Sequence, residues 1–545
     1  MRIKSHTSQP KRDKNEIFEN HRTESEWTKN VPSIPEFYAN QEIFITGGSG
    51  FLGKVLIEKL LRSCSELKSI YILLRPKKGK PIEQRLKEIL ELQLFEPIKN
   101  YNPELFKKLI PIAGDVSDKN LGLSTDDLNR MKNVSIIFHS AASVRFDDSL
   151  KDAVFMNTRG TYEIMNFGKT LKNIKVIMHV STTYSHPELK VVDECIHQPY
   201  VDWRKTIQIC ETMDDNLINT LAELYTGFMP NTYTFTKALA EQVVDDHKDE
   251  LPLTLFRPSI VISAMKEPLS GWLDNFNGPV GMLIGSGLGI TRTMYCDPDN
   301  IADFTPVDVC IKAMIIGAWK RAHETSYLPV INCCLSNYRN ATIDQIIEMG
   351  KAFQYEIPLG QMLWAPGGSL TRCRYSNYIK VIFLHIIPAM LIDQLLKLSG
   401  RKPFLTKLQR KIYQANLALH YFILNNWHFK NDNFMDLCSH LKDKDLKAFN
   451  FHDFLEFDLV LYFTHAVLGG RKYLLGEKDE DIPRDKKKYY RMMILDRILK
   501  IIIYGICFWY IFIRYDIFGI SGLYCSLVQR YHSNVDYCVG LMVRV

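Results

Sequence analysis

The chain lacks the features that mark several classes of protein. Its 545 residues include twelve cysteines, but these are scattered without the spacing of a metal site or a disulfide framework, and the adjacent Cys333 and Cys334 have no matching pair elsewhere. We therefore predict reduced thiols, a cytosol-facing chain and no metal site. Residues 1–30 are charged and contain no apolar run, which excludes a secretory signal or a membrane helix there and predicts a disordered leader.

A strong excess of one charge is also missing. The net charge is +7, and the basic residues lack the aromatic interleaving of a nucleic-acid surface, so we predict no nucleic-acid partner. Hydrophobic residues make up 46% of the chain, which is ample for a large core. Length and composition together are typical of a large enzyme with more than one domain.

Residues 43–53, IFITGGSGFLG, are the most informative stretch, because a short apolar strand leads into a glycine-spaced turn and then a helix. Gly47 permits the tight turn, Gly50 lets the backbone approach a pyrophosphate, and Gly53 lets the helix pack closely on the strand. The predicted fold class is α/β, a Rossmann-type doubly wound parallel sheet. The cofactor-binding residues predicted at this turn are Thr46, Gly47, Gly50, Phe51, Leu52 and Gly53.

A second buried strand over residues 70–74 ends at Arg75. Sites that prefer NAD usually carry Asp or Glu at this point, whereas an arginine can pair with a 2′-phosphate. Lys77 and Lys78 add to the positive charge, so the predicted cofactor is NADPH. Without the glycine turn, the same residues would indicate only a solvated basic loop.

Two further strands, over residues 109–113 and 134–138, end in small residues, which recur where a cofactor must pass. Asn157, on an amphipathic run over residues 150–171, is predicted to support the sheet edge near the site. A turn cap is an equally good interpretation of Asp115. The cofactor-binding residues predicted here are Asp115 and Val116 at the adenine, and Ser140, Ala141 and Ala142 beneath the ribose.

Tyr233 and Lys237 are four residues apart and share one helix face if Thr232 or Asn231 caps the helix. An ammonium group near a phenol lowers its pKa, which would let the phenol exchange a proton with a carbonyl oxygen while a hydride moves. Lysine can also hold the ribose. Such a pair occurs often by chance, but its place downstream of a nucleotide-binding half favours catalysis.

A third catalytic group should come from the end of a strand over residues 175–180. Thr182 is the preferred hydroxyl for polarising the substrate oxygen, and Ser181 is the alternative, since one of them should face the cofactor while the other supports the backbone. β-branched residues also end strands simply because they are good strand formers.

The order of these parts resembles the extended short-chain dehydrogenase/reductases. In particular, YILLRPKKGK, NTYTFTKALAEQVV and FRPSIVISAMKEPLSGWLDNFNGPVG resemble the alcohol-forming fatty acyl-CoA reductases, especially the insect type, over residues 37–470. The resemblance implies that a long-chain fatty acyl-CoA takes two hydrides from two NADPH and gives a fatty alcohol and free coenzyme A. Tyr233 and Thr182 would stabilise the oxyanion, and Tyr233, tuned by Lys237, would protonate an aldehyde.

The resemblance also assigns residues downstream of the tyrosine. Pro258 and Ser259, together with Arg257, would border the nicotinamide. A loop with Trp272, Asn275 and Gly278 would form a lid, whereas Asp303 and Asp308 are predicted to be structural caps.

The expected organisation is an NADPH-binding reductase domain over residues 31–336 and a helical carboxy-terminal domain over residues 337–480. Residues 379–398 are apolar but are interrupted by His385, Pro388 and Asp393, which favours an interfacial or substrate-capping helix over a membrane span. Core packing is the plain alternative.

Residues 493–513 are predicted to be a membrane anchor, followed by a tail over residues 514–545. An in-plane or re-entrant segment is the competing interpretation. Basic residues cluster before the anchor and are few after it, so the positive-inside rule places the catalytic part in the cytosol. The resemblance suggests the endoplasmic reticulum or the peroxisome, and the sequence gives no oligomeric state.

Two other functions remain open at this point. One is another extended short-chain reductase, acting on a sterol or a nucleotide sugar. The other is a non-catalytic membrane scaffold of the same fold, which the presence of Tyr233, Lys237 and Thr182 disfavours.

Overall fold

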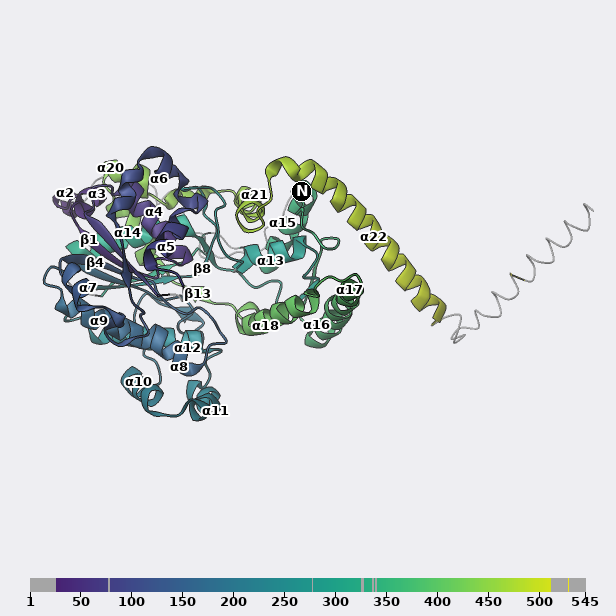
Figure 1. Cartoon of the computed structure of the whole chain (residues 1–545), viewed down its shortest axis with the longest axis horizontal. Helices are drawn as coiled ribbons and strands as arrows, with labels where there is room; N and C mark the ends of the chain where they lie inside the picture. Colours follow the sequence, from purple (N-terminus) through teal and green to yellow (C-terminus); the bar gives the residue numbers. More distant parts are fainter. Residues whose placement is uncertain are drawn as a thin grey trace, which may run out of the picture.

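The computed structural model describes residues 26–76, 79–276, 278–324, 328–335, 338, 341–510 and 528. Its centre is a parallel sheet of seven strands in the order β11-β7-β5-β4-β1-β2-β3 (Figure 1). Because β1 lies between β2 and β4, the chain winds outward in both directions, which confirms the predicted doubly wound fold. The strands are β1 Glu42–Thr46, β2 Ser69–Leu74, β3 Leu109–Ala113, β4 Val134–His139, β5 Val176–Val180, β7 Leu253–Pro258 and β11 Val330–Cys333.

The central strands are continuous apolar runs because helices cover both faces of the sheet. Every residue of β1, β2, β4, β5 and β7 is buried. The helices α4 (Phe51–Ser63) and α14 (Val307–His323) cover one face. The other face is covered by α8 (Leu150–Ala153), the π-helical η4 (Val154–Arg159), α9 (Gly160–Thr170) and α12 (Thr232–Asp246) (Figure 1).

The remaining elements complete the first three hundred residues. They are α2 Glu26–Asn30, α3 Ile34–Tyr38, α5 Ile82–Leu90, η1 Gln93–Phe95, α6 Glu96–Tyr101, η2 Pro103–Lys108, η3 Lys119–Gly122, α7 Thr125–Arg130, β6 Val191–Val192, α10 Trp203–Thr212, α11 Asp215–Thr226, β8 Ile260–Ile262, α13 Gly278–Gly287, β9 Thr293–Tyr295 and β10 Phe304–Pro306.

The carboxy-terminal region is mainly helical, as predicted. Its elements are α15 Ile343–Glu356, β12 Ser369–Thr371, α16 Arg374–Val381, η5 Ile382–Ile386, α17 Ile387–Leu398, α18 Leu405–Leu424, β13 His428–Phe429, α19 Asp432–Asp436, η6 Leu437–His440, α20 Asp443–Phe449, η7 His452–Glu456, α21 Leu459–Gly469, η8 Gly470–Leu474, η9 Asp479–Asp481 and α22 Ile482–Phe508.

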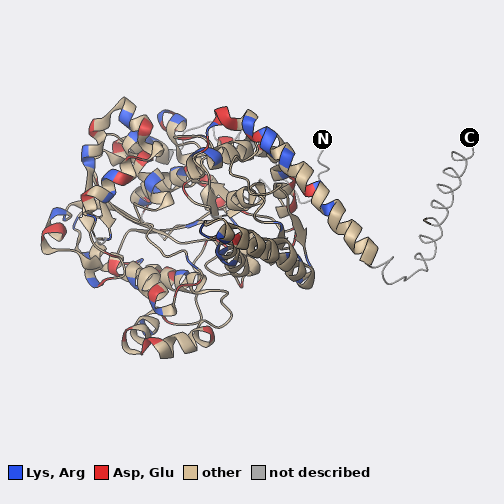
Figure 2. Ribbon diagram, turned by 45° about the vertical axis from the view of Figure 1, so that its right-hand side comes forward, with Lys and Arg blue, Asp and Glu red and all other residues tan. Residues whose placement is uncertain are grey.

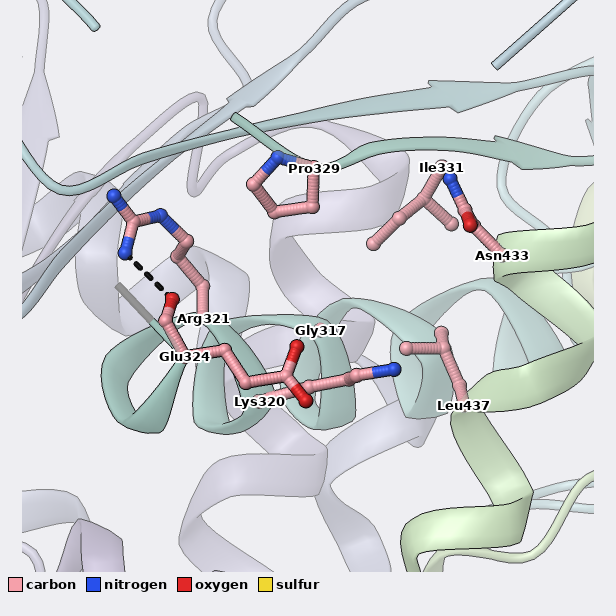
Figure 3. A pocket seen from close by; sticks show the side chains of 8 residues that line it. All are labelled: Gly317, Lys320, Arg321, Glu324, Pro329, Ile331, Asn433 and Leu437. Carbon is pink, nitrogen blue, oxygen red and sulfur yellow. Dashed lines mark hydrogen bonds between the residues drawn. The ribbon is translucent and has the colours of Figure 1, made fainter. Parts of the chain in front are cut away.

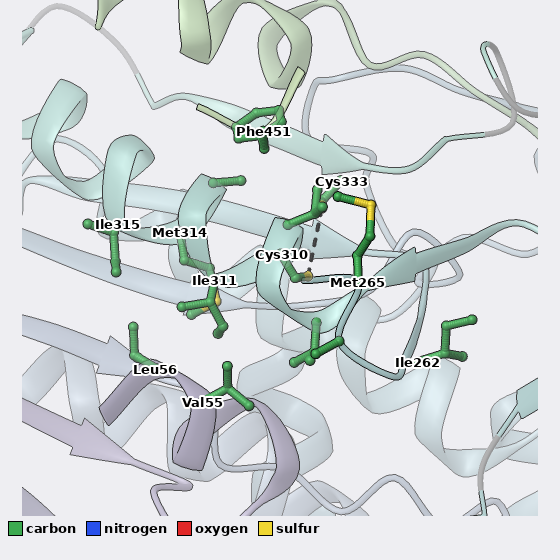
Figure 4. Packing of buried hydrophobic residues seen from close by; sticks show 14 of the residues in the cluster. Val55, Leu56, Ile262, Met265, Cys310, Ile311, Met314, Ile315, Cys333 and Phe451 are labelled. Atoms are coloured by element: carbon green, nitrogen blue, oxygen red, sulfur yellow. Dashed lines mark hydrogen bonds between the residues drawn. The ribbon is translucent and has the colours of Figure 1, made fainter. Parts of the chain in front are cut away.

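This helical region shares a core with the sheet. Phe451 lies in the same hydrophobic cluster as Val55 and Leu56 of α4 and Ile311 of α14 (Figure 4). Short parallel pairs join the two regions as well, since β13 pairs with β6 and β12 pairs with β9. The two predicted domains therefore pack as one continuous body.

The end of the predicted leader is ordered. Residues 1–25 lie outside the described residues, but residues 26–30 form α2, and the Trp27 ring meets the Trp319 ring edge to face at 5.3 Å. A buried aromatic contact with α14 explains why the chain becomes helical before residue 31.

One described helix is long and apolar enough to cross a membrane, the continuous helix Arg374–Leu398 formed by α16, η5 and α17. The sequence favoured an interfacial or capping helix here because of its polar residues. The predicted anchor over residues 493–513 begins in α22, whereas residues 511–513 and the tail, apart from residue 528, lie outside the described residues. The anchor stays a prediction.

Candidate active site

The glycine turn after β1 has the geometry of a dinucleotide cradle. Gly47 has a φ of +75°, and a Cβ there would lie 2.7 Å from the backbone nitrogen of Ala141. A Cβ on Gly53 would overlap the carbonyl oxygen of Gly47, so the helix packs too closely for any side chain. Gly50 is the N-cap of α4 and no described side chain caps it, which leaves the helix N-terminus available to a pyrophosphate. Phe51 and Leu52 form the first turn of α4.

The ends of β1 and β4 are joined by hydroxyl groups. Thr46 and His139 are register partners, and their side chains are hydrogen-bonded at 2.7 Å. The Ser140 hydroxyl donates to the Thr46 carbonyl at 2.8 Å, and the Ala141 N–H donates to the Thr46 hydroxyl at 3.3 Å. The predicted ribose-binding segment, which includes Ala142, is therefore fixed directly against the glycine turn.

Arg75 lies at the end of β2 with 63% of its side chain exposed, 3.5 Å from the Asp115 carboxylate. The guanidinium is therefore accessible to an anion. Asp115 accepts hydrogen bonds from both the backbone and the side chain of Ser117, which is the turn-cap role left open by the sequence. Val116 is buried against Gly160 in the core, and Lys77 and Lys78 lie outside the described residues.

Asn157 supports the site from the π-helical segment η4. Its amide nitrogen donates to the Thr236 hydroxyl at 2.9 Å and to the Ser143 carbonyl at 3.1 Å, while its oxygen accepts from the Ser143 N–H at 2.8 Å. It thereby links the loop after β4 to the helix α12, which carries the predicted catalytic pair.

Tyr233 and Lys237 lie one turn apart on α12, and the cap of this helix is Asn231, whose side chain accepts the Thr234 N–H at 2.9 Å. The Thr182 side chain lies near enough to the Tyr233 hydroxyl to lower its pKa. Lys237 is buried and donates to the Val180 carbonyl, at the end of β5, at 2.7 Å. The pair therefore faces the carboxyl end of the sheet, where cofactors bind in this fold.

The pKa of Tyr233 differs from the prediction. Burial of its hydroxyl raises the pKa of Tyr233 to about 12, although part of the side chain is exposed, and Thr182 opposes the rise. Burial also lowers the pKa of Lys237 to about 8, against the attraction of Glu241. The expected fall of the phenol pKa is therefore wrong for this state, because desolvation dominates and the ammonium group is bound to a backbone carbonyl.

The structure separates the two candidate hydroxyl groups. Thr182 faces Tyr233, whereas the Ser181 hydroxyl donates to the Glu241 carboxylate at 2.5 Å. Glu241 is fully buried and also accepts two hydrogen bonds from Arg257, at 2.9 and 2.6 Å. Arg257 extends this network to the carbonyls of residues 193 and 195. Thr182 therefore stays the candidate for chemistry, whereas the Ser181 hydroxyl is bound in the Glu241 network.

Sequence reasoning missed Glu241, although its position one turn after Lys237 was a usable signal. Burial would raise the pKa of this carboxyl, but the Arg257 guanidinium holds it below its usual range. Glu241 therefore stays ionised beside Lys237 and joins the catalytic helix to β7.

The residues at and after the end of β7 form hydrogen bonds that fix the neighbouring loops. The Thr183 N–H donates to the Pro258 carbonyl at 3.1 Å, and the Ser259 and Thr305 hydroxyls are 2.9 Å apart. Asp308 accepts the N–H groups of residues 265–267, as a structural cap does, and Asp303 accepts the Leu335 N–H.

The predicted lid loop packs over the glycine turn. Trp272 is buried and stacks on Phe51, with centroids 5.5 Å apart and planes inclined by 19°. Gly278, further along the loop, has a φ of +68° and begins α13. Asn275 is hydrogen-bonded to its neighbour Asp274, whose carboxylate pairs with Lys54 of α4.

An aromatic cluster extends from Tyr233 to α18, and no sequence pattern indicated it. Phe146 stacks on Tyr233 at 5.8 Å and meets Phe422, from α18, at 5.5 Å. Tyr184 contacts Phe422 at 5.5 Å and Trp427 at 5.4 Å. Residues almost two hundred positions apart thus bring the helical region close to Tyr233, as only a three-dimensional structure can reveal.

A small cavity elsewhere is not part of this site. It is lined by Arg321 and Lys320 of α14 and by Pro329, which precedes β11 (Figure 3). Arg321 donates to the Leu253 carbonyl at the start of β7. This is the amino end of the strands, opposite Tyr233.

Comparisons with known proteins agree with this geometry. A family model described as "Male sterility protein", of the NAD-binding type, matches residues 45–314, and the "Sterile" model, also described as "Male sterility protein", matches residues 384–477. The fatty acyl-CoA reductase wat of Drosophila melanogaster is 35% identical over 90% of this chain and 95% of its own length. Fatty acyl-CoA reductase 1 of Rattus norvegicus is 37% identical over 84% and 88%, respectively.

Solved structures support the fold. The reductase domain of a non-ribosomal peptide synthetase from Mycobacterium tuberculosis matches with a TM-score of 0.53 at 16% identity, covering 86% of this chain and 97% of that one. The terminal R domain from the myxalamid PKS-NRPS biosynthetic pathway matches with a TM-score of 0.52 at 18% identity, covering 84% and 97%.

Proposed function

The chain belongs to the family of fatty acyl-CoA reductases, and from this premise we propose that it reduces long-chain fatty acyl-CoA to fatty alcohol with two NADPH. The observation that carries the proposal is the placement of Tyr233 and Lys237 one turn apart on α12, with the Lys237 ammonium group on the Val180 carbonyl at the carboxyl end of β5. The aldehyde is the intermediate between the two reductions.

The residues present fit a nicotinamide dinucleotide. The turn at Gly47 has no space for a side chain, the start of α4 is uncapped, and both features suit a pyrophosphate. The exposed Arg75 guanidinium suits a 2′-phosphate and supports NADPH over NADH. When bound, the reduced cofactor supplies a hydride for each of the two reductions.

In the first reduction, a hydride adds to the thioester carbonyl carbon and the carbon–sulfur bond breaks, so that coenzyme A leaves as a thiolate and takes up a proton. Negative charge develops on the carbonyl oxygen before the thiolate leaves. The hydroxyls of Thr182 and Tyr233 would donate hydrogen bonds to that oxygen, and the closeness of Thr182 to Tyr233 supports this role.

In the second reduction, a hydride adds to the aldehyde carbon and the oxygen takes a proton to become an alcohol. Tyr233 would donate this proton. A pKa near 12 keeps the phenol protonated at neutral pH, which suits a proton donor in the reductive direction. Lys237, with a pKa near 8, lies one turn below and supports the ionised phenolate that remains.

The aromatic cluster around Tyr233 provides an apolar environment for the acyl chain next to the reacting carbonyl. Because substrate and product both partition into bilayers, we also propose membrane association through the carboxy-terminal segment, with the catalytic part facing the cytosol at the endoplasmic reticulum or the peroxisome.

The test is turnover by the full chain in membranes. Palmitoyl-CoA with NADPH should give hexadecanol and free coenzyme A, with two NADPH consumed for each alcohol, and NADH should be much less effective. Tyr233→Phe should lower the rate by about 10²- to 10⁴-fold while NADPH still binds. The matched control is Tyr225→Phe, which removes a hydroxyl bonded to Thr206 outside the site and should leave the rate unchanged.

The alternatives give different results in the same assay. Full activity of Tyr233→Phe would refute the mechanism. NADPH binding without any product from palmitoyl-CoA would favour a non-catalytic scaffold, and turnover of a sterol or nucleotide sugar instead would favour another extended reductase.

A further inference from the structure

The helix Arg374–Leu398 turns His385 and Asp393 toward the protein and, apart from Arg374, Gln394 and Lys397 near its ends, an apolar face toward the outside. Only four of its 25 residues are buried, and these recur at every fourth position, at Val381, His385, Ala389 and Asp393. The helix therefore touches the rest of the protein along one narrow line.

Both polar residues on this line are bound to the protein. His385 Nε2 accepts the Arg292 N–H at 2.7 Å. The Asp393 carboxylate caps the beginning of α18 and accepts the N–H groups of residues 404–406 at 2.8 to 3.0 Å. The polar groups that interrupt the apolar run in the sequence are thus turned inward and hydrogen-bonded.

The outward face is apolar. Phe383, Leu391 and Leu395 are each more than 60% exposed, and Leu398 is 85% exposed. This arrangement is the reverse of a helix on a water-facing surface, where polar residues point outward. Polar-inward and apolar-outward residues are expected where hydrocarbon, rather than water, surrounds a helix.

A second apolar helix segment, in α22, is also bound to Arg292. The Arg292 guanidinium pairs at 3.2 Å with Asp496 of α22, and Trp364 donates to the same carboxylate at 2.7 Å. Beyond Asp496, residues 497–510 of the chain are exposed on all sides and carry charge only at Arg497 and Lys500. Arg292 therefore holds both helices, and the second contains most of the predicted membrane anchor. Figure 1 shows α22 extending away from the rest of the protein.

The charge around these helices is strongly positive. Residues 374–424 contain eight lysines and arginines and a single carboxylate, the capping Asp393, a local excess that equals the net charge of the whole chain. Basic residues also gather at the start of α22, where Figure 2 shows several Lys or Arg positions. Lys487, Lys488 and Arg491 are among the residues that line a surface hollow of about 400 Å³ there. This charge attracts anionic headgroups and repels a second copy of the same surface.

We propose that the outward face of Arg374–Leu398 and the second half of α22 lie together in the hydrocarbon of a phospholipid bilayer, with the surrounding basic residues at anionic headgroups. The catalytic body is thereby held against the membrane by a second contact besides the carboxy-terminal anchor. This inference does not depend on the reaction.

The test is photo-crosslinking in the full chain. A benzophenone amino acid replaces Phe383, or Tyr101 as a matched aromatic control, which is 87% exposed on α6. Each variant is reconstituted into phosphatidylcholine vesicles with or without phosphatidylserine and irradiated. A third variant carries the crosslinker at Ile502 in α22 to report on the anchor alone.

We expect lipid adducts at positions 383 and 502 and none at 101, with a severalfold higher yield at 383 when phosphatidylserine is present and a lower yield at high salt. Adducts between two copies of the chain at 383 would overturn the proposal and identify a dimer interface. Lipid adducts at 502 without any at 383 would also overturn it and leave the anchor as the single contact. Equal denaturation midpoints for all three variants show that the fold is intact, and a position-383 variant that fails this check is replaced by one at Leu391.

Discussion

Glu241→Gln tests how the catalytic helix is positioned. The wild-type carboxylate is fully buried, accepts two hydrogen bonds from Arg257 and one from Ser181, and lies one turn from Lys237. Glutamine keeps the shape and one acceptor but leaves the guanidinium buried without its counter-charge. Removing one partner from a buried ion pair costs about 3–5 kcal/mol, so we expect a clearly lower denaturation midpoint.

The same substitution should change the pH profile. Glu241 raises the pKa of Lys237, which burial lowers to about 8. Without this carboxylate the lysine loses its proton at lower pH, so the alkaline limb of kcat against pH should move down by about one unit or more.

The pH dependence of the stability that Glu241 contributes can also be predicted. Its folded pKa is depressed, so the stability it contributes is present above the unfolded pKa and is lost as pH falls through the folded pKa. The wild type should therefore lose its stability advantage over Glu241→Gln in acid.

The matched control is Asp485→Asn, which breaks another buried ion pair, between Arg471 and Asp485 at 3.0 Å, far from the catalytic helix. Because Arg471 keeps a second carboxylate, Glu477 at 3.2 Å, we expect a smaller loss of stability and an unchanged pH profile. If Glu241→Gln also leaves the alkaline limb in place, Glu241 is only structural and the proposed electrostatic link to Lys237 is wrong.

Four further substitutions separate the roles of individual side chains. Thr182→Val should lower kcat by about 10²-fold because an oxyanion donor is lost, whereas Ser181→Ala should mainly cost about 1 kcal/mol of stability, and the opposite ranking in steady-state assays would exchange their roles. Arg75→Ala should raise KM for NADPH by about tenfold to a hundredfold and leave KM for NADH unchanged, and equal effects on both would contradict a 2′-phosphate contact. Phe422→Ala should raise KM for palmitoyl-CoA severalfold, since a ring next to Phe146 is lost, and an unchanged KM would show that the acyl chain does not pass there.

The strands and the glycine turn could be predicted because their signals are local. Apolar runs that end at Thr46 and His139 are continuous in sequence, and parallel strands covered on both faces require such runs. The Tyr233–Lys237 spacing similarly fixes both side chains on one helix face once Asn231 caps the helix.

The rest of the site depends on contacts between distant residues. The choice between Ser181 and Thr182 is set by Glu241, sixty residues later, and the pKa of Tyr233 is set by the burial of its hydroxyl. Phe422 reaches the tyrosine only because α18 packs back against the sheet domain. Sequence patterns report periodicity and spacing, but they do not report desolvation or long-range packing.

The polar residues of the helix Arg374–Leu398 are a second case in which the sequence pattern alone is a poor guide. His385 and Asp393 argue against a membrane helix when the sequence is considered as a linear string. In three dimensions they lie on the single buried line, where Arg292 and the start of α18 use their hydrogen-bonding capacity. Whether a polar residue excludes a lipid contact therefore depends on the direction in which it points.

The helix α18 connects the proposed membrane surface to the proposed chemistry. Its first turn is capped by Asp393 of the membrane-facing helix, and its last turn places Phe422 against Phe146, which stacks on Tyr233. A helix of 20 residues spans about 30 Å, which is comparable to the length of a long acyl chain with its thioester. The charged coenzyme A must stay in water while the chain prefers hydrocarbon, so the reacting carbonyl belongs at their boundary. We therefore expect charged substitutions at Leu391 and Leu395 to slow reduction of palmitoyl-CoA in vesicles while sparing a short, water-soluble acyl-CoA, because only the long chain depends on delivery from the bilayer.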